Sequence, residues 1–470
     1  MITETQLQSM RLAENATSSD PYILKKLIEE HNTTSMRQGV DYYNNDNAIR
    51  NRKIFAYDAD GRKFEDDEAI NNRIPHNWHK LLVDQKVSYL LGKPIVLTAE
   101  PEKLSEEVNG FLDEDFDDVL QEIGKGSSNK GTEYLHPFIN SQGKFDYIVV
   151  SALQGIPIYD TDYEQEMVAF IRYYPYWVNG KETIRAEWWT ADDVTYYIKQ
   201  PSGMYVFDDS VDNPANHFSV GEEGKGWGKV PFVEFRNNEE KYSDLRFYKE
   251  IVDAYDLIIA NRANTIEDIQ KAFYVLKGYD GTSLSEFNAN LRRYRAAKVS
   301  GDGGIDIEQG DVPVEAEDST LDRMEENIFL FGQGVNIKTD KFGQSPSGVA
   351  LKFLFHLLDL KANIMARKFA KAIKEFVWFL IEYLRITDKF SAPQDALDSV
   401  RVTFNKAMPV NEAEMVEIAQ NSLNIISRQT IRSNHPWSED AQYEKEQMEQ
   451  EQEGMIDLDQ FGGGDDEPVE

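Results

Sequence analysis

One segment, residues 349–385, constrains the fold more than any other part of the chain. It contains neither glycine nor proline, and its apolar residues lie on nearly every side of a helical wheel. At ~1.5 Å per residue, such a helix would be about 55 Å long. Charged residues such as Lys352, Asp359 and Lys361 interrupt it too often for a bilayer span. The segment therefore predicts a long helix buried within protein, between subunits of an assembly.

A second pair of helices is expected on either side of a compact insert. Apolar residues recur at helical spacing from Ser243, a suitable N-cap, to about residue 277, which predicts a helix roughly 50 Å long. Another helix is expected to start at Ser319, where S-T-L-D resembles a capping box, and to end near Phe331. Residues 278–318, between these helices, are rich in glycine and aspartate and predict only short elements.

The region from about residue 130 to 236 has a different pattern. It is rich in Tyr, Trp, Val and Ile, with turn residues between short runs, which predicts β-strands. Two further short strands are expected to meet at Asp60-Gly61, and a helix is expected after Pro75. The sequence GKGSSNKG, residues 124–131, lacks the preceding strand and the ending of a phosphate loop, so it is interpreted as a flexible loop. Together these patterns predict an α+β fold.

Composition excludes several classes of protein. The 470 residues include 83 acidic and 50 basic side chains, a formal net charge of −33, which argues against a basic nucleic-acid-binding face. The absence of cysteine excludes disulfide scaffolds, cysteine nucleophiles and thiolate-ligated metals. No apolar run is long enough for a membrane-spanning helix, and the first residues do not resemble a signal peptide, so we expect no membrane association.

Catalytic chemistry is hardly visible. The seven histidines are scattered, and no nucleophile elbow, Walker loop or dinucleotide motif is present. His76 and His79 could share one helical face, but no further ligand lies nearby, so capping or core packing is predicted rather than a metal site. We expect no cofactor and no enzymatic activity. The alternative is a hydrolase that uses acidic residues of the β-rich region.

Three stretches of the chain resemble the portal, or head–tail connector, proteins of tailed bacteriophages, in the siphophage branch of Gram-positive hosts. They are residues 71–95 (NNRIPHNWHKLLVDQKVSYLLGKPI), residues 117–160 and residues 421–451. The first is the most specific, and the three follow the order of the family. The insert at 278–318 carries no signature of its own.

The resemblance implies a portal-type fold in which each region of the chain has a place. The wing would comprise residues 1–242 together with 349–410, the long wing helix and its returning strand. The stem would comprise helices 243–277 and 319–335, the clip 278–318, and the tunnel loop 336–348. A helical crown at 411–453 and an acidic, disordered tail at 454–470 would complete the chain.

The resemblance also implies a function. The chain would form a homo-oligomeric ring, usually a dodecamer, at one vertex of the capsid in the virion, after assembly in the host cytoplasm. The ring would conduct double-stranded DNA during packaging and ejection, without sequence specificity, and nucleate procapsid assembly. Its expected partners are the large terminase subunit, the head–tail adaptor, and the scaffold and major capsid proteins.

The size of a helix and the charge of the chain are both consistent with such a ring. Twelve helices about 10 Å wide would leave an opening of roughly 28 Å, enough for duplex DNA. Twelve copies would carry a charge of about −400, and a negative wall lets DNA slide. Few cations should then face the channel.

Two clusters are the candidate sites. DNA-facing contacts are expected in the tunnel loop, from Asn336, Lys338, Thr339, Lys341, Gln344 and Ser345. The alternative is that the two lysines only solubilise the loop or pair with acids of neighbouring subunits. In the clip, the basic residues Arg292, Arg293, Arg295 and Lys298 are expected to contact the adjacent subunit, the terminase or the adaptor.

Overall fold

The long helix forms the centre of the protein in the computed structural model. The structure describes residues 20–58, 60–160, 166–178, 180–220, 223–269, 273–277, 304–308, 314–336, 348–388, 390, 393, 395–407, 412–423, 425–433, 438, 444–445 and 447–449. Helix α10 (Gly348–Ile386) has 39 residues, so the predicted helix is confirmed. Met365, Phe369, Phe376 and Leu380 are fully buried and recur at helical spacing along one side of α10, where they form much of the main core.

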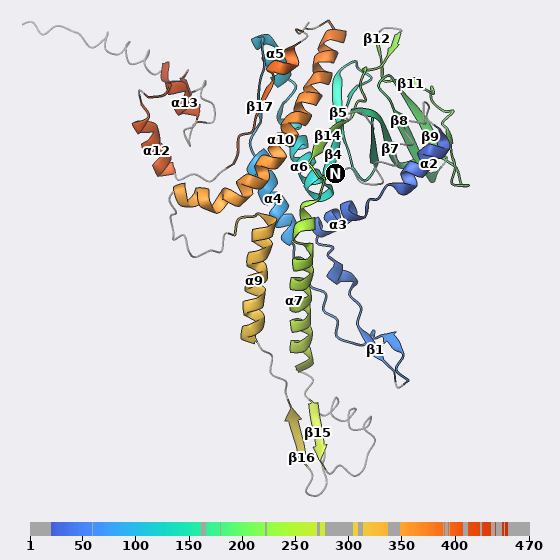
Figure 1. Ribbon diagram of the computed structural model, residues 1–470, viewed down its shortest axis with the longest axis vertical. Helices are drawn as coiled ribbons and strands as arrows, with labels where there is room; N and C mark the ends of the chain where they lie inside the picture. Colours follow the sequence, from blue (N-terminus) through green and yellow to red (C-terminus); the bar gives the residue numbers. More distant parts are fainter. Residues whose placement is uncertain are drawn as a thin grey trace, which may run out of the picture.

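The elements that pack on α10 come from the first half of the chain. Helices α4 (Trp78–Leu91) and α6 (Glu114–Lys130) lie against it, together with a three-stranded antiparallel sheet. The strands of that sheet, in the order β14–β4–β5, are Val233–Arg236, Thr132–Ile139 and Phe145–Val150. Figure 1 shows this body at the top of the molecule, with α10 crossing it.

The predicted flexible loop at 124–131 is wrong. These residues form the last turns of α6, and Gly131 ends the helix with a φ of 91°. A β-carbon at Gly124 would lie 2.7 Å from Cδ1 of Leu91, so the glycine allows α6 to approach α4. Gly124 thus serves helix packing, and Ser127 and Ser128 donate to its carbonyl oxygen within α6, so residues that look like a loop locally belong to a helix.

The cap of α6 gives a testable prediction. A β-carbon at Gly131 would lie 2.0 Å from the carbonyl oxygen of Lys241, in addition to the strain of a positive φ. We expect Gly131→Ala to lower the free energy of unfolding by about 2–4 kcal/mol, since left-handed strain alone costs about 1–2 kcal/mol. Gly143→Ala is the matched control, because Gly143 has a φ of 73° with nothing near its missing β-carbon. Equal losses in guanidinium denaturation would contradict a role for the close contact.

A six-stranded antiparallel sheet forms the outer part of the body. Its main path runs β10–β9–β8–β7–β6, and β11 (Ala215–Asn216) pairs with β9. The strands of the path are Tyr205–Phe207, Asp193–Lys199, Lys181–Trp189, Met167–Val178 and Gly155–Tyr159. Helix α2 (Pro21–Glu30) buries Leu24 and Leu27 in the same core as strands β6 to β10. The predicted β-rich region is therefore confirmed.

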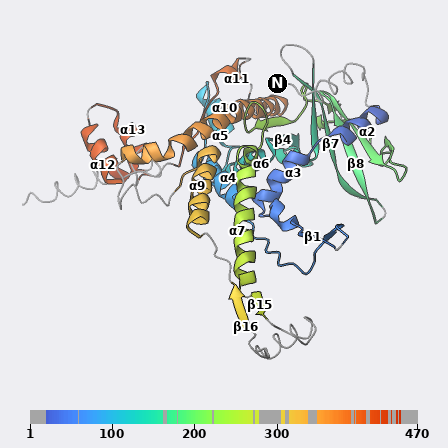
Figure 2. The same cartoon turned by 60° about the horizontal axis from the view of Figure 1, so that its bottom comes forward.

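Two antiparallel helices, α7 (Lys249–Ile269) and α9 (Val314–Gly332), extend away from the body (Figures 1 and 2). Ser243 caps a short 3₁₀ turn, Asp244–Phe247, before α7 begins. The helix predicted to run to residue 277 ends at Ile269, and α9 begins five residues before Ser319. Strands β15 (Phe273–Lys277) and β16 (Gly304–Glu308) pair at the far end of the two helices. A pairing between residues so far apart in sequence overrides the local helical pattern.

The remaining elements surround this frame. They are α3 (Thr34–Tyr43), η1 (Ala48–Asn51), β1 (Phe55–Tyr57), β2 (Lys63–Glu65), β3 (Val96–Thr98), α5 (Glu102–Asn109), β12 (Phe218–Val220), β13 (Glu223–Lys225), α11 (Ala396–Ser399), β17 (Arg401–Thr403), α12 (Glu412–Asn421) and α13 (Arg428–Ser433). The hairpin at Asp60-Gly61 and the strand near residue 400 are as predicted, and β17 pairs with β3. None of the described helices combines the length and apolar character that a bilayer crossing requires.

Candidate functional site

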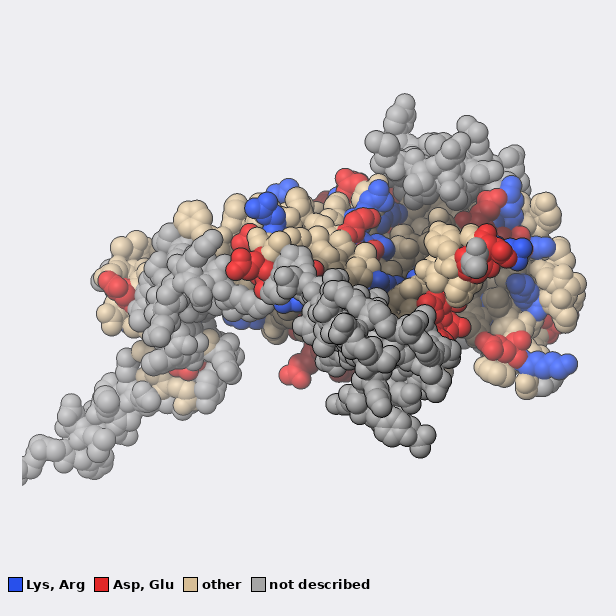
Figure 3. Space-filling view, turned by 90° about the horizontal axis from the view of Figure 1, so that it is seen from below, with Lys and Arg blue, Asp and Glu red and all other residues tan. Residues whose placement is uncertain are grey.

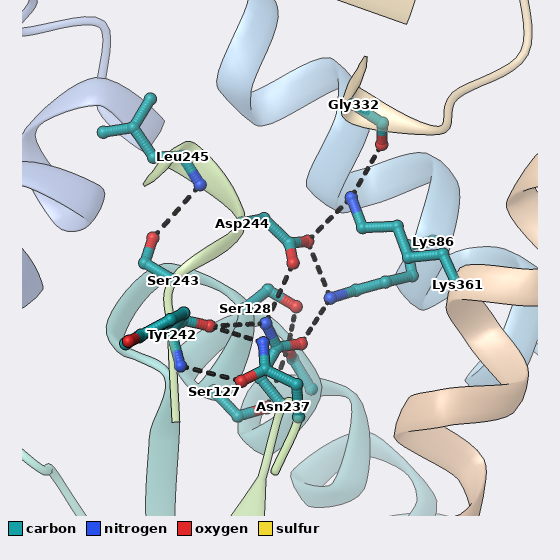
Figure 4. A network of polar contacts seen from close by, with 12 residues as sticks. Lys86, Ser127, Ser128, Asn237, Tyr242, Ser243, Asp244, Leu245, Gly332 and Lys361 are labelled. Carbon is teal, nitrogen blue, oxygen red and sulfur yellow. Dashed lines mark hydrogen bonds and ion pairs between the residues drawn. The ribbon is translucent and has the colours of Figure 1, made fainter. Parts of the chain in front are cut away.

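A buried charged cluster joins the paired helices to the body. Asp244, at the start of the 3₁₀ turn before α7, lies 2.7 Å from Nζ of Lys86 on α4 and 3.0 Å from Nζ of Lys361 on α10. Lys361 also donates to the carbonyl oxygen of Gly332, at the end of α9, over 2.8 Å. The two lysines and the aspartate therefore connect α4, α7, α9 and α10 at one point (Figure 4). We call Lys86, Asp244 and Lys361 the junction cluster.

Asn237 completes the polar contacts of this cluster. Its Oδ1 accepts from Nζ of Lys86 at 2.6 Å, and its Nδ2 donates to Oδ1 of Asp244 and to the carbonyl oxygen of Tyr242, each at 2.9 Å. Lys86 and Asp244 thus have several partners each, which a buried charge requires. The strand β14 ends next to Asn237, so the three-stranded sheet is held at the same point.

The pKa values of Lys86 and Asp244 are both lowered, but for different reasons. Burial lowers the pKa of Lys86 to about 8, although Asp244 opposes this shift. Burial alone would raise the pKa of Asp244, but the two lysines outweigh it and hold that pKa well below its ordinary value. Two ammonium groups therefore depend on one carboxylate. His79, on the same helix as Lys86, has a pKa lowered to about 4 by burial and is neutral.

The same region fixes the start of the segment that follows α9. Nε2 of Gln85 donates to the carbonyl oxygen of Val335 at 2.9 Å, and the backbone N–H of Val335 donates to Oε1 of Gln85 at 3.0 Å. β-carbons at Gly332 and Gly334 would lie 2.5 Å and 2.2 Å from the methyl groups of Leu82, so both glycines let the chain pass close to α4. The predicted tunnel loop thus begins from a fixed position beside the junction cluster.

Most of the predicted site residues lie outside the described residues. Asn336 is described; it directly follows Val335 and is half-buried. The other candidate residues lie in two segments that are outside the described part of the chain. Segment 337–347 contains Lys338, Thr339, Lys341, Gln344 and Ser345, and segment 278–303 contains Arg292, Arg293, Arg295 and Lys298. Their DNA-facing and clip-contact roles therefore stay predictions.

Sequence reasoning missed the junction cluster. Lys86 lies four residues after Leu82 and four before Leu90, on the buried side of α4. The one sequence feature that could have indicated the cluster is a lysine within the apolar stripe of a helix. Its partners Asp244 and Lys361 are more than 150 residues away, and only the tertiary structure brings them together.

The two histidines near Lys86 have structural partners. Nδ1 of His79 is hydrogen-bonded to the hydroxyl of Tyr248 at 2.7 Å, and Nδ1 of His76 lies 2.7 Å from Oδ1 of Asp256. These contacts attach α4 and the segment before it to α7, as the predicted packing role requires. Within the described ranges, no group of three or more His, Asp or Glu side chains could hold a metal ion.

Comparison with known proteins decides the class of the chain. The family model described as phage portal protein, SPP1 Gp6-like, matches residues 24–457. The chain belongs to this family. The portal protein of Bacillus phage SPP1 is 38% identical over 464 residues, which cover 97% of this chain and 92% of the relative. The portal protein of the Clostridium phage phiCD119 is 31% identical over 421 residues, covering 86% of this chain and 90% of that protein.

A solved structure is also similar. It is a chain in the virion of a native gene transfer agent particle, with 11% sequence identity and a TM-score of 0.39, and the match covers 76% of this chain and 88% of that one. The family assignment rests on the sequence matches.

Membership in the portal family establishes the general function, the location and the non-enzymatic class of the chain. Portal proteins are structural components of the phage capsid that assemble as rings at a vertex, not enzymes. The predicted portal function, virion localisation and lack of enzymatic activity are therefore confirmed. The alternative of a hydrolase in the β-rich region has no support, and that region instead forms the sheet that packs on α10 and the outer six-stranded sheet.

Proposed function

We propose that twelve copies of this chain form a ring whose channel conducts double-stranded DNA into and out of the capsid. The observation that carries the proposal is the match of the portal family model across residues 24–457. The helices α7 and α9 support it, since two antiparallel helices that lie side by side and project from a broad body can line a channel when copies stand side by side (Figure 1).

The proposal assigns a part to each region. Helices α7 and α9 form the stem, and the segment between them, with the β15–β16 pair, forms the clip. The body, including α10 and β17, forms the wing, residues 336–348 form the tunnel loop, and 411–453 form the crown. The acidic tail follows at 454–470. The junction cluster then lies where stem, wing and tunnel loop meet.

The DNA contact is proposed to be weak and non-specific. Asn336, Lys338, Thr339, Lys341, Gln344 and Ser345 would face the DNA from the tunnel loop. On the face seen from below, the described acidic and basic side chains are interspersed and form no continuous basic patch (Figure 3). Together with a net charge of −33 per copy, this distribution favours sliding over tight binding, because few phosphates would be neutralised.

The clip and the outer surfaces are proposed to bind other phage proteins. The basic residues Arg292, Arg293, Arg295 and Lys298 would contact the adjacent clip, the large terminase subunit during packaging, or the head–tail adaptor afterwards. The wing and crown would meet the scaffold and the major capsid protein while the procapsid forms in the host cytoplasm.

Replacing both loop lysines tests the DNA-conducting role. We expect Lys338→Ala with Lys341→Ala to leave ring assembly intact and to reduce the DNA packaged per particle at least several-fold, because the channel would lose its few cationic contacts. The measurement is nuclease-protected DNA in particles assembled with the variant. Lys371→Ala, an exposed lysine in the middle of α10, is the matched control. Normal packaging by the double variant would contradict the loop contact.

A further inference from the structure

The hairpin β1–β2 projects from the body beside α7 (Figures 1 and 2). We call residues 52–72, the hairpin and its two connecting segments, the arm. Every described residue of the two strands except Ala56 is exposed. Phe55 is 46% exposed, Tyr57 70% and Phe64 47%.

This exposure is unusual for such an element. A two-stranded hairpin alone in water is marginally stable at best, because it has no apolar face to bury. Phe55 and Tyr57 lie on one face of the hairpin and Phe64 on the other, since Phe64 pairs with Ala56. Among the residues that the structure describes, none covers either face, so both faces are free to be covered by a partner.

The arm is nevertheless fixed in place at its base. Nη2 of Arg52 donates to Oδ1 of Asn261 at 2.6 Å, and the backbone N–H of Asn72 donates to Oδ1 of Asn264 at 2.8 Å. Nδ2 of Asn72 also donates to Oε2 of Glu267 at 3.2 Å. Both ends of the arm are thus attached to successive turns of α7. The exposed hairpin therefore has a defined position relative to α7.

Helix α9 lies on the other side of α7. Its Asp318 accepts from Nη1 of Arg262 at 2.5 Å. At 100° per residue, Asn264 is about 200° from Arg262 around α7, so the arm and α9 contact nearly opposite sides of that helix. The Arg262–Asp318 pair also places this part of α9 at the same height as the base of the arm.

The free face of α9 suits the arm. One stripe, at four- and three-residue intervals, is exposed along the whole helix and consists of Glu315, Ser319, Asp322, Glu326 and Leu330. Its acids make no ion pair with another described residue. The exposed neighbours Ala316 and Thr320 are small, which leaves room for aromatic rings between the acids.

The arm offers complementary charge at its tip. The Arg62 side chain is exposed and pairs with no described acid, while Nζ of Lys63 lies 4.1 Å from the centre of the Phe55 ring. Two acids of the arm are already engaged: Asp58 accepts backbone N–H groups of the turn, and Glu65 pairs with Lys53 at 2.6 Å. Arg62 and Lys63 are therefore the cations available to an acidic partner surface.

We propose that the arm docks on the free face of α9 in the neighbouring copy of the ring. In a ring of side-by-side copies, each copy presents one side to the preceding copy and the opposite side to the next. The arm and α9 occupy such opposite sides of α7. The aromatic residues of the arm cover the small residues of α9, and Arg62 and Lys63 meet Glu315 and Asp322. This inference rests on the proposed ring.

Removing the aromatic residues tests the docking. Phe55→Ser with Tyr57→Ser is expected to raise the concentration needed for half-assembly by about tenfold or more, since central aromatic contacts dominate interfaces. The thermal midpoint of the isolated subunit should not change, because neither ring is buried in it. Tyr22→Ser is the control: Tyr22 is 67% exposed and lies on α2, which packs on the six-stranded sheet, away from α7 and α9. The measurement is sedimentation velocity over a concentration series.

A charge exchange tests the assigned partner surface. Arg62→Glu with Lys63→Glu should weaken assembly in the same way, and adding Glu315→Lys with Asp322→Lys should restore it. Weak assembly without restoration would overturn α9 as the docking site. Normal assembly of both arm variants would overturn the docking altogether and leave the ring intact. If the unmodified chain forms no ring alone or with scaffold and capsid protein, the proposed ring fails and this inference with it.

Discussion

Replacing Asp244 with alanine is expected to lower the free energy of unfolding by about 3–5 kcal/mol, because it leaves two buried ammonium groups without their carboxylate. Asp244 lies within 3.0 Å of Nζ of both Lys86 and Lys361 and is itself buried. Chemical denaturation of the isolated subunit, followed by circular dichroism, measures the loss.

Two variants serve as controls for this prediction. Lys86→Met should cost less than Asp244→Ala, since Lys361 still neutralises Asp244 and burial already disfavours the charged form of Lys86. Glu29→Ala removes a surface pair with Lys25 at 3.9 Å and should cost less than about 1 kcal/mol. A loss for Asp244→Ala no larger than for Glu29→Ala would show that the junction cluster does not hold the helices together.

Acidification is expected to destabilise the protein well above the pH at which carboxylates protonate. Burial lowers the pKa of His79 to about 4 and that of His136 to about 3, from an ordinary value of 6.5. Between pH 6.5 and 4 the unfolded chain takes up protons that the folded chain does not. Stability should therefore fall with falling pH, by about 1 kcal/mol per pH unit for each histidine. Burial raises the pKa of Glu133 and Glu375, which works in the opposite direction.

A single variant isolates the contribution of one histidine. Nδ1 of His136 contacts the carbonyl oxygen of Pro231 at 2.6 Å, and its ring stacks on Phe232. His136→Phe keeps the packing and removes the titration, so unfolding free energies between pH 6.5 and 4 should vary less steeply, by about 1 kcal/mol per pH unit. An unaltered slope in His136→Phe would mean that His136 is protonated in the folded state.

Local patterns predicted the elements whose own side chains decide their structure. The apolar residues of α10 repeat through 39 residues, so its extent follows from periodicity. Ser243 acts as the predicted N-cap, because its Oγ accepts from the backbone N–H of Leu245 at 3.2 Å. The portal family was also identified from three segments of the sequence, residues 71–95, 117–160 and 421–451, which resemble the family.

Local patterns failed where distant residues decide. Residues 124–131 look like a loop until α4 lies against them, and Phe273–Lys277 continues a helical pattern until Gly304–Glu308 pairs with it. In each case a contact formed on folding outweighs a propensity of less than about 1 kcal/mol per residue.

The sequence by itself therefore determined the α+β class, the long central helix, the two rods with an insert between them, and the portal family. Only the tertiary structure decided that Lys86, Asp244 and Lys361 form one cluster, that Gln85 holds Val335 beside it, and that the arm and α9 lie on opposite sides of α7. The physical reason is that periodicity and capping act over a few residues of one chain segment. Burial of a charge and the direction of an exposed face are set by neighbours that are far away in the sequence.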